Sequence, residues 1–314
     1  MMVVLTGGTG SAKFVDGLKQ LLPARKLTLV VNTGDDLEWW GLHVSPDLDS
    51  IMYVLAGMLS KDRGWGVDLD TFECVEAMRR MGAPAWFRVG DRDLATHMTR
   101  TQLLASGRTL SEATAEIAAA LGVQSRVLPM SDARVETRVT TPEGELSFQE
   151  YFVRERYRPE VLGVRFAGAE QASPAPGVLE AIKSADAVVL APSNPVTSIG
   201  PILAVPGIRD ALRATAAPVA AISPIVGGAA VSGPAGALMA SQGLFVSIAG
   251  VAQTYSDFLD LLIVDERDAT AAEELRLSGL QVHCAQTIMK TANDKAALAA
   301  TVLELVTRSA ARAG

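Results

Sequence analysis

Two periodicities alternate along the chain and divide it into candidate strands and candidate helices. Short uninterrupted apolar runs indicate buried strands, whereas apolar residues that recur every three or four positions indicate amphipathic helices. The runs lie at 3–5, 27–31, 187–190, 219–222 and 261–264, and the clearest helical periods at 14–22, 110–121 and 296–306. Because parallel strands covered on both faces are apolar throughout, this alternation predicts an α/β protein with a Rossmann-like, doubly wound, mainly parallel sheet.

The middle of the chain departs from this rhythm. Residues 49–121 are mostly helical by period, and residues 126–149 alternate around a Pro-Glu-Gly turn, which predicts a β-hairpin. A Pro- and Gly-rich joint at 173–177 precedes the return of the α/β rhythm. We therefore expect a single Rossmann-like domain over 1–314, with a helical and β-hairpin insertion or subdomain at about 70–172.

The apolar excess raises the question of a membrane protein. Mean hydropathy is +0.24, charged residues make up only 20% of the 314, and residues 214–256 carry no charge at all. A membrane-spanning helix needs about 20 unbroken apolar residues, but this stretch is interrupted by prolines and glycine pairs. The stretch therefore favours a buried strand, a glycine loop and a helix, and we expect no contact with a membrane.

Charge and cysteine content narrow the class further. Acidic residues outnumber basic ones by 35 to 28, which argues against broad contact with nucleic acid. Cys74 and Cys284 stand alone, and the three histidines lack the spacing of a zinc site. The first residues, MMVVLTGG, lack the basic and long apolar regions of a signal peptide. A cytoplasmic location is expected.

A glycine-rich turn, GGTGSAK at residues 7–13, follows the first predicted strand. It is neither a GxGxxG fingerprint nor a P-loop. Its backbone N–H groups and the start of the following helix nevertheless suit a phosphate group. A tight turn without a ligand is the alternative, and Lys13 could face either a phosphate or the solvent.

Four aspartates come soon after this turn. Asp35 and Asp36 follow the second predicted strand, and Asp47 and Asp49 precede a helix expected to start near Ile51. So many carboxylates beside an anion-binding turn repel one another unless a cation lies between them, and oxygen ligands select magnesium. Two alternatives stay open, because aspartates also cap turns and helices and an aspartate after the second strand can bind a ribose hydroxyl.

Three later segments could complete a site. Residues 88–97 (RVGDRDLATH) are densely charged, and the loops at 191–200 and 223–228 each follow a predicted strand. Ligands of a doubly wound sheet bind beyond the carboxyl ends of its strands, so these loops should face the same crevice as the aspartates. A solvated helix start and simple connectors are the alternatives, and for Trp39, Trp40 and Tyr53 an aromatic wall competes with core packing.

Together these motifs resemble the 2-phospho-L-lactate transferase family, whose enzymes build the deazaflavin coenzyme F-420. The resemblance is closest to the bacterial branch, for which an enolpyruvyl donor is expected. The matching motifs run in the family's order: GGTG at 7–10, NTGDD at 32–36, PDLD at 46–49, GDRDLATH at 90–97, FQE at 148–150, APSNP at 191–195, SIGPIL at 198–203 and SPI at 223–225.

The resemblance implies a magnesium-dependent transferase. It would move a phosphoenolpyruvate or 2-phospho-L-lactate group from enolpyruvyl- or lactyl-2-diphospho-5′-guanosine to 7,8-didemethyl-8-hydroxy-5-deazariboflavin (Fo), releasing GMP and forming (dehydro) coenzyme F-420-0. A homodimer is also implied. The alternative is a nucleotide-sugar-binding regulatory protein of the gluconeogenesis-factor type, which shares the fold but has no turnover.

The resemblance also implies site residues. It assigns the metal to Asp35 and Asp47, and a catalytic role to Asp35, Asp36 and Asp49. Contacts with Fo fall to Asp49, Arg88, Asp91 and His97, and phosphate or guanosine contacts to Gly8, Thr9, Gly10, Ser11, Ser193, Asn194, Gly227 and Gly228. One departure is that Ala229 and Ser232 stand where related sequences often carry a basic residue.

Overall fold

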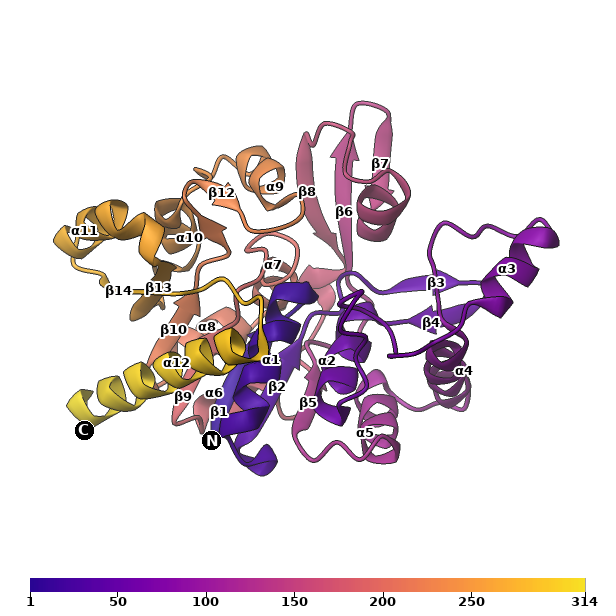
Figure 1. Ribbon diagram of the computed structural model, residues 1–314, viewed down its shortest axis with the longest axis horizontal. Helices are drawn as coiled ribbons and strands as arrows, with labels where there is room; N and C mark the ends of the chain where they lie inside the picture. The colour runs from indigo at the N-terminus through magenta and orange to yellow at the C-terminus, as the bar shows by residue number, and fades with distance from the viewer. Residues whose placement is uncertain (314) are drawn as a thin grey trace.

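The structure, a computed structural model that describes residues 1–313, is built on one seven-stranded sheet (Figure 1). All neighbouring strands in this sheet are parallel. Their order is β5-β2-β1-β9-β10-β13-β14, so the chain starts in the middle, builds one edge and then returns to build the other. The predicted doubly wound α/β fold is confirmed. The strands are β1 (Met2–Thr6), β2 (Leu27–Val31), β5 (Arg126–Pro129), β9 (Ala187–Leu190), β10 (Val219–Ile222), β13 (Leu261–Asp265) and β14 (Gln281–Ala285).

Helices cover both faces of the sheet, which explains why its inner strands are apolar throughout. On one face, residues of α1, α2, α5 and α12 form a hydrophobic cluster that includes Val4 and Leu29 of the sheet, and on the other face residues of α6, α7, α8, α10 and α11 form a cluster that includes Val3 and Val30. The covering helices are α1 (Gly8–Leu21), α2 (Pro46–Ala56), α5 (Leu110–Ala120), α6 (Val178–Lys183), α7 (Gly200–Ala204), α8 (Ile208–Ala214), α10 (Ile248–Tyr255), α11 (Ala269–Leu277) and α12 (Ala292–Ala313).

The remaining elements lie mostly above the carboxyl ends of the strands or beside the sheet (Figure 1). Strands β6 and β7 form the predicted hairpin, and β8, which the sequence did not predict, pairs with the other edge of β6. These elements are β3 (Leu37–Trp39), β4 (Leu42–Val44), α3 (Glu73–Arg80), α4 (Asp91–Ala105), β6 (Glu136–Thr141), β7 (Gly144–Ser147), the π-helix η2 (Glu150–Arg154), β8 (Gly163–Ala167), β11 (Ile225–Val226), β12 (Ala229–Ala230) and α9 (Ala235–Ser241). Short 3-10 helices lie at η1 (Ala24–Lys26), η3 (Ala169–Gln171) and η4 (Glu266–Asp268).

Two sequence-based expectations are wrong in detail. Residues 126–149 are not one hairpin, because Val127 and Leu128 are buried where β5 pairs with β2 at the edge of the central sheet. The predicted insertion at about 70–172 thus contains a strand of that sheet, and its standing as a subdomain stays a prediction. Helix α2 begins at Pro46 rather than near Ile51, so Asp47 and Asp49 lie in its first turn. A proline at the first helical position is a favourable start that the period of apolar residues does not reveal.

The charge-free stretch at 214–256 forms β10, the β11–β12 hairpin and the helices α9 and α10. This agrees with the predicted strand and glycine loop, with two helices in place of one. Within the described residues, no helix combines the length and the apolar character that crossing a bilayer demands.

The centre of the fold is the point where the chain leaves β1 toward one edge of the sheet and β9 toward the other. The loops that follow these two adjacent strands touch: the hydroxyls of Ser11 and Ser193 contact each other, and Ser193 donates to the carbonyl oxygen of Gly7 at 2.6 Å. A Cβ atom on Gly10 would overlap the backbone carbonyl of Pro192. The glycine turn is therefore required for the two loops to meet, whatever it binds.

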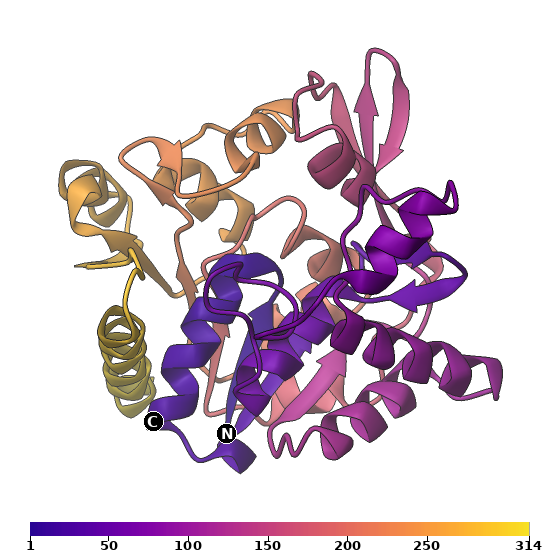
Figure 2. The ribbon, with the colours of Figure 1, turned by 45° about the vertical axis from the view of Figure 1, so that its right-hand side comes forward.

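A second close approach joins the ends of the chain, where α12 packs along α1 (Figures 1 and 2). Gly17, in the middle of α1, leaves room for the backbone of Lys295, whose carbonyl oxygen a Cβ atom would overlap. Lys295 also reaches Asp16 on α1 through an ion pair of 2.8 Å.

We expect Gly17→Ala to destabilise the protein by about 1–3 kcal/mol, because the added methyl group pushes α12 away from α1. Alanine has the higher helix propensity, by about 1 kcal/mol, so a gain in stability would contradict this packing. Gly236→Ala in α9 is the matched control, since the nearest atom to its Cβ is the flexible side chain of Val246 at 3.3 Å. Urea unfolding of both variants measures the difference.

Candidate functional site

A cavity of about 710 Å³ opens above the carboxyl ends of the central strands. It is the crevice that the doubly wound topology predicts at the junction of β1 and β9. Loops from both halves of the chain line it, and most of the residues expected at a site are among them: Gly8, Thr9, Gly10, Lys13, Asp35, Asp47, Asp49, Arg88, His97, Ser193 and Asn194.

The glycine turn forms one end of the cavity floor. The backbone N–H of Gly8 donates to Asp47 Oδ1 at 2.7 Å, which ties the turn to the start of α2. Ser11, expected to contact phosphate, is instead fully buried and donates to the carbonyl oxygen of Gly7 at 2.9 Å. Its role is to brace the turn, while Gly8, Thr9 and Gly10 face the cavity.

Asp35 and Asp47 are buried at the cavity floor without a basic partner. Asn32 Nδ2 donates to Asp47 Oδ2 at 3.0 Å, and Asp35 Oδ1 has no hydrogen-bond partner. Among the side chains of residues 1–309, no lysine, arginine or histidine forms an ion pair with either carboxylate. Burial, with repulsion from Asp47 and Asp36, raises the pKa of Asp35 well above its ordinary value. Burial also raises the pKa of Asp47 to about 6, although Asn32 and the Gly8 N–H oppose it.

These two side chains fit a divalent cation. They offer hard oxygen ligands, both side chains are buried, and one of those oxygens lacks any other partner. Magnesium in proteins is typically held by one or two such carboxylates together with substrate phosphates. The anion-binding turn beside them supplies the place for those phosphates.

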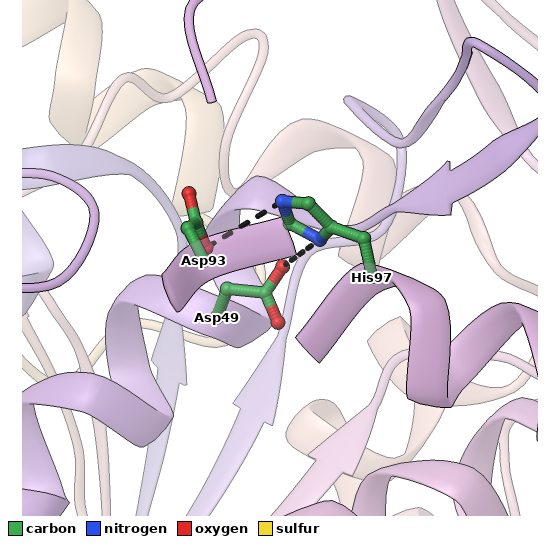
Figure 3. Close-up of side chains that lie close together, drawn as sticks. All are labelled: Asp49, Asp93 and His97. Carbon is green, nitrogen blue, oxygen red and sulfur yellow. Dashed lines mark ion pairs between the residues drawn. The ribbon is translucent and has the colours of Figure 1, made fainter. Parts of the chain in front are cut away.

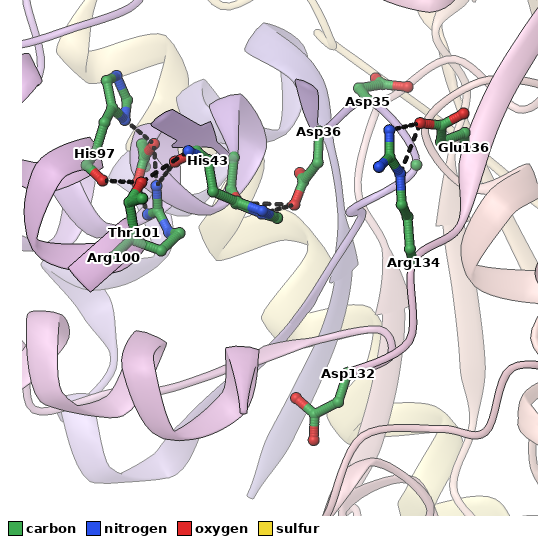
Figure 4. A network of polar contacts seen from close by, with 12 residues as sticks. Asp35, Asp36, His43, His97, Arg100, Thr101, Asp132, Arg134 and Glu136 are labelled. Atoms are coloured by element: carbon green, nitrogen blue, oxygen red, sulfur yellow. Dashed lines mark hydrogen bonds and ion pairs between the residues drawn. The ribbon is translucent and has the colours of Figure 1, made fainter. Parts of the chain in front are cut away.

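Asp36 behaves differently from its neighbour, because it points away from Asp35 toward His43 (Figure 4). His43 Nε2 lies 3.0 Å from its Oδ2, and Ser45 donates to the same oxygen at 2.7 Å. Burial still raises the pKa of Asp36. It does not line the cavity, so the expected catalytic role of Asp36 finds no support in its position.

Asp49, Asp93 and His97 meet at another point of the cavity wall (Figure 3). His97 Nδ1 lies 3.4 Å from Asp49 Oδ2, and its Nε2 lies 3.5 Å from Asp93 Oδ1. Tyr53 donates to Asp93 at 2.7 Å. Burial alone raises the pKa of Asp93, but His97, the Tyr53 hydroxyl and Arg100 outweigh it and hold that pKa below its usual range. All of these side chains are buried.

An aromatic wall that the sequence analysis did not identify completes the cavity. Trp65, Trp86, Phe87, Phe148 and Phe152 line it. Phe148 and Phe152 stack with their ring centroids 5.5 Å apart. The signal for Trp65 was its position between two glycines in a segment without helical period, where an aromatic side chain has little chance of reaching a core.

The aromatic residues that the sequence did single out divide between core and cavity. Trp39 is buried and packs with Val44 and Val89, with Trp40 partly buried against the same cluster. Only Tyr53 faces the cavity. Core packing therefore accounts for the tryptophan pair.

Three other expected contacts lie outside the cavity. Gly227 and Gly228 form the β11–β12 turn, where the Gly227 N–H donates to Asp268 at 3.0 Å, and it is the nearby residues 231–235 that line the cavity. Ser232 is among them, whereas Ala229 lies in β12. Asp91 accepts hydrogen bonds from the backbone of Glu73 and Cys74 at 3.0 and 2.9 Å, and so caps the start of α3.

The raised pKa of Asp47 predicts how stability changes with pH when a chelator removes divalent cations. The unfolded chain ionises this group near pH 3.8 and the folded protein near pH 6, so the folded state loses stability as pH rises through this window. From pH 5 to pH 7 the loss is about 1–2 kcal/mol. In urea unfolding, the pH dependence should be smaller in Asp47→Asn than in the wild type by about this amount, and the remainder comes from groups such as Asp35, whose pKa is also raised. Equal pH dependence in both proteins would contradict the assignment.

The position of Asp91 predicts a purely structural effect for Asp91→Ala. Removing the cap of α3 should cost about 1–2 kcal/mol of unfolding free energy, because two backbone N–H groups lose their acceptor. Fo, the acceptor implied by the family resemblance, should bind with unchanged affinity in a fluorescence titration. A tenfold weaker affinity for Fo in the folded variant would contradict this and would indicate that Asp91 contacts Fo.

Comparison with known proteins agrees with this geometry. A family model described as 2-phospho-L-lactate transferase CofD matches residues 2–304. A 2-phospho-L-lactate transferase from Methanosarcina barkeri is 43% identical over 304 residues, covering 97% of this chain and 98% of its own. A phosphoenolpyruvate transferase from Streptomyces griseus is 47% identical over 310 residues, with the same coverage.

Solved structures show the same fold at low identity. A crystal structure of a UPF0052-family protein from Bacillus halodurans superposes with a TM-score of 0.66 and 17% identity, covering 96% of this chain and 98% of that one. That likeness concerns the fold alone. The family model and the relatives together decide the family: the chain belongs to the 2-phospho-L-lactate transferase family, CofD.

Proposed function

We propose that this protein transfers a phosphoenolpyruvate or 2-phospho-L-lactate group from a guanosine diphosphate conjugate to Fo, releasing GMP. One observation carries the proposal. The buried pair Asp35 and Asp47, without a basic partner in the described chain, lies in one cavity with an anion-binding turn and an aromatic wall. These are the features that a diphosphate donor, a cation and a planar acceptor require. The names of the Methanosarcina and Streptomyces relatives support the same reaction.

The donor would lie over the glycine turn. Gly8, Thr9 and Gly10 face the cavity at the start of α1, where backbone N–H groups and the helix dipole favour phosphate. Lys13 and Lys290 also line the cavity, and neither forms an ion pair with another part of the described chain. These positive charges suit the diphosphate and the carboxylate of the three-carbon acid. Asn194 and Ser193 lie on the same side for the guanosine.

The acceptor would lie against the aromatic wall. A deazaflavin ring is flat and largely apolar, so stacking on residues such as Trp65 or Phe148 stabilises it. Arg88, whose guanidinium lies 4.4 Å from the ring centre of Phe72, borders the same region. Asp49 and His97 offer polar atoms to the ribityl hydroxyls.

In the reaction, a ribityl oxygen of Fo forms a bond to the phosphorus that carries the three-carbon acid. The bond from that phosphorus to the bridging oxygen breaks, GMP departs, and the hydroxyl proton passes to solvent. Such transfers depend on alignment and charge stabilisation more than on a protein nucleophile. Asp49 accepts a hydrogen bond from the hydroxyl and orients it. Asp35 and Asp47 would hold magnesium, which would supply positive charge for the diphosphate.

The identity of the three-carbon acid follows from the relatives alone. Identity is 47% to the Streptomyces griseus phosphoenolpyruvate transferase and 43% to the Methanosarcina barkeri 2-phospho-L-lactate transferase. We propose the enolpyruvyl donor on this basis, with dehydro coenzyme F-420-0 as the product. Mass spectrometry of the product formed from Fo with each donor in turn tests it, and a product containing only the lactyl group would overturn it.

The regulatory alternative is not favoured, because the family model and the whole-chain relatives are named as transferases. Fo binding separates the two, since only a transferase needs a deazaflavin site. A cytoplasmic location and a homodimer are part of the proposal and rest on the family resemblance.

Asp35→Asn should abolish magnesium-dependent release of GMP, by at least about a thousandfold, while the protein stays folded. The reason is that the cation loses one of its two protein ligands. Release of GMP from the donor with Fo is measured by chromatography, and circular dichroism checks the fold. Asp16→Asn is the control, because Asp16 pairs with Lys19 and Lys295 outside the cavity. Retained GMP release by folded Asp35→Asn would refute the metal assignment.

A further inference from the structure

Arg100 is a fully buried charged residue in the third turn of α4, and the proposed reaction does not yet use it. Its guanidinium holds the carboxylate of Asp49 with two nitrogens: Nη1 donates to Oδ2 at 3.2 Å, and Nη2 donates to Oδ1. Nη1 also lies 3.5 Å from the carbonyl oxygen of His43. Burial alone would lower the pKa of Arg100, but the charge of Asp49 outweighs it and raises that pKa, so the side chain stays charged.

Stability alone does not explain this buried pair, because burying an ion pair rarely stabilises a protein more than an apolar pair of the same volume. The two-pronged contact fixes the plane of the Asp49 carboxylate, since a planar guanidinium matches both oxygens at once. Asp49 is also flanked by His97, which Asp93 holds from its other side (Figure 3). The carboxylate therefore cannot rotate without breaking the pair with Arg100.

The contrast with Asp47 shows what the two-nitrogen contact between Arg100 and Asp49 achieves. Asp47 and Asp49 lie two residues apart in the first turn of α2, and both face the cavity. Asp49 has a buried arginine as its partner, whereas Asp47 has no basic partner among the side chains of residues 1–309.

We propose that Arg100 is a positioning residue, which aims Asp49 at the acceptor hydroxyls and withholds it from the cation at Asp35 and Asp47. This inference rests on the proposed function, because Fo is taken as the acceptor. Arg100 does not line the cavity and acts only through Asp49. A cation held by Asp49, Asp93 and His97 themselves is the competing arrangement, but it would have to share Asp49 oxygens that already accept from Arg100.

Arg100→Lys tests the role of the two-nitrogen contact with Asp49, since lysine keeps the charge but offers a single point of contact. Without donor present, the affinity for Fo, followed by its fluorescence, should fall about tenfold, and Mn²⁺ should bind about tenfold more tightly as Asp49 becomes available. In an Asp49→Asn background the same change should have no further effect on either. Arg209→Lys is the matched control, because Arg209 holds Asp257 with two nitrogens far from the cavity residues.

The proposal would be overturned if folded Arg100→Lys bound Fo or Mn²⁺ with wild-type affinity. It would also be overturned if the changes in affinity caused by Arg100→Lys added to those caused by Asp49→Asn. If Arg100→Lys does not fold, Asp49→Asn and Asp49→Asn/Arg100→Met carry the test, because removing both partners leaves no unpaired buried charge. The double variant must then bind Fo as weakly as Asp49→Asn and no more weakly. A wild-type protein that fails to bind Fo would instead overturn the proposed function, and the Mn²⁺ comparison would still decide the role of Arg100.

Discussion

The contact between the loops after β1 and β9 is the constraint on which the site depends. These strands are neighbours, so their loops must pass each other over the same edge of the sheet. They can do so only because Gly10 leaves room for the carbonyl of Pro192. The turn that results directs the Gly8 N–H at Asp47, and thereby connects the start of α1 to the start of α2. The position of the acidic residues thus follows from a backbone packing requirement.

The electrostatics of the cavity build on this framework. In a protein with few charges, an acidic group that is buried without a partner costs free energy unless a ligand compensates it. Asp36 contacts His43 on β4, Asp49 pairs with Arg100 on α4, and Asp93 contacts His97 one turn further along its own helix. Among the side chains that the structure describes, no basic group forms an ion pair with Asp35 or Asp47. The acidic groups around the pair therefore have basic neighbours, whereas the pair itself is where a bound cation would fit.

The sequence predicted much of the sheet and little of the cavity wall. Runs such as 219–222 are strands at the predicted residues, because a strand buried on both faces needs apolar residues at every position. Edge strands such as β14 are only partly buried and escape that rule. The aspartates were found because four of them lie close together in the sequence after the glycine turn. Which of them are paired depends on Arg100 and His43, residues that only the tertiary structure brings near. Asp91 shows the limit: its motif matched the family, yet its carboxylate caps a helix.

The comparison with the UPF0052-family structure locates the source of specificity. Two chains with 17% identity share this fold over almost their full lengths, so the doubly wound sheet and its crevice do not by themselves select an acceptor. Selection has to come from side chains placed by the segments between β2 and β9, which bring Trp65, Trp86 and Phe148 to one wall. The glycine turn and α1, by contrast, belong to the sheet's own central junction. Under the proposed function, the donor would therefore lie at the junction that the fold fixes, and the acceptor would lie against side chains from the segments between β2 and β9.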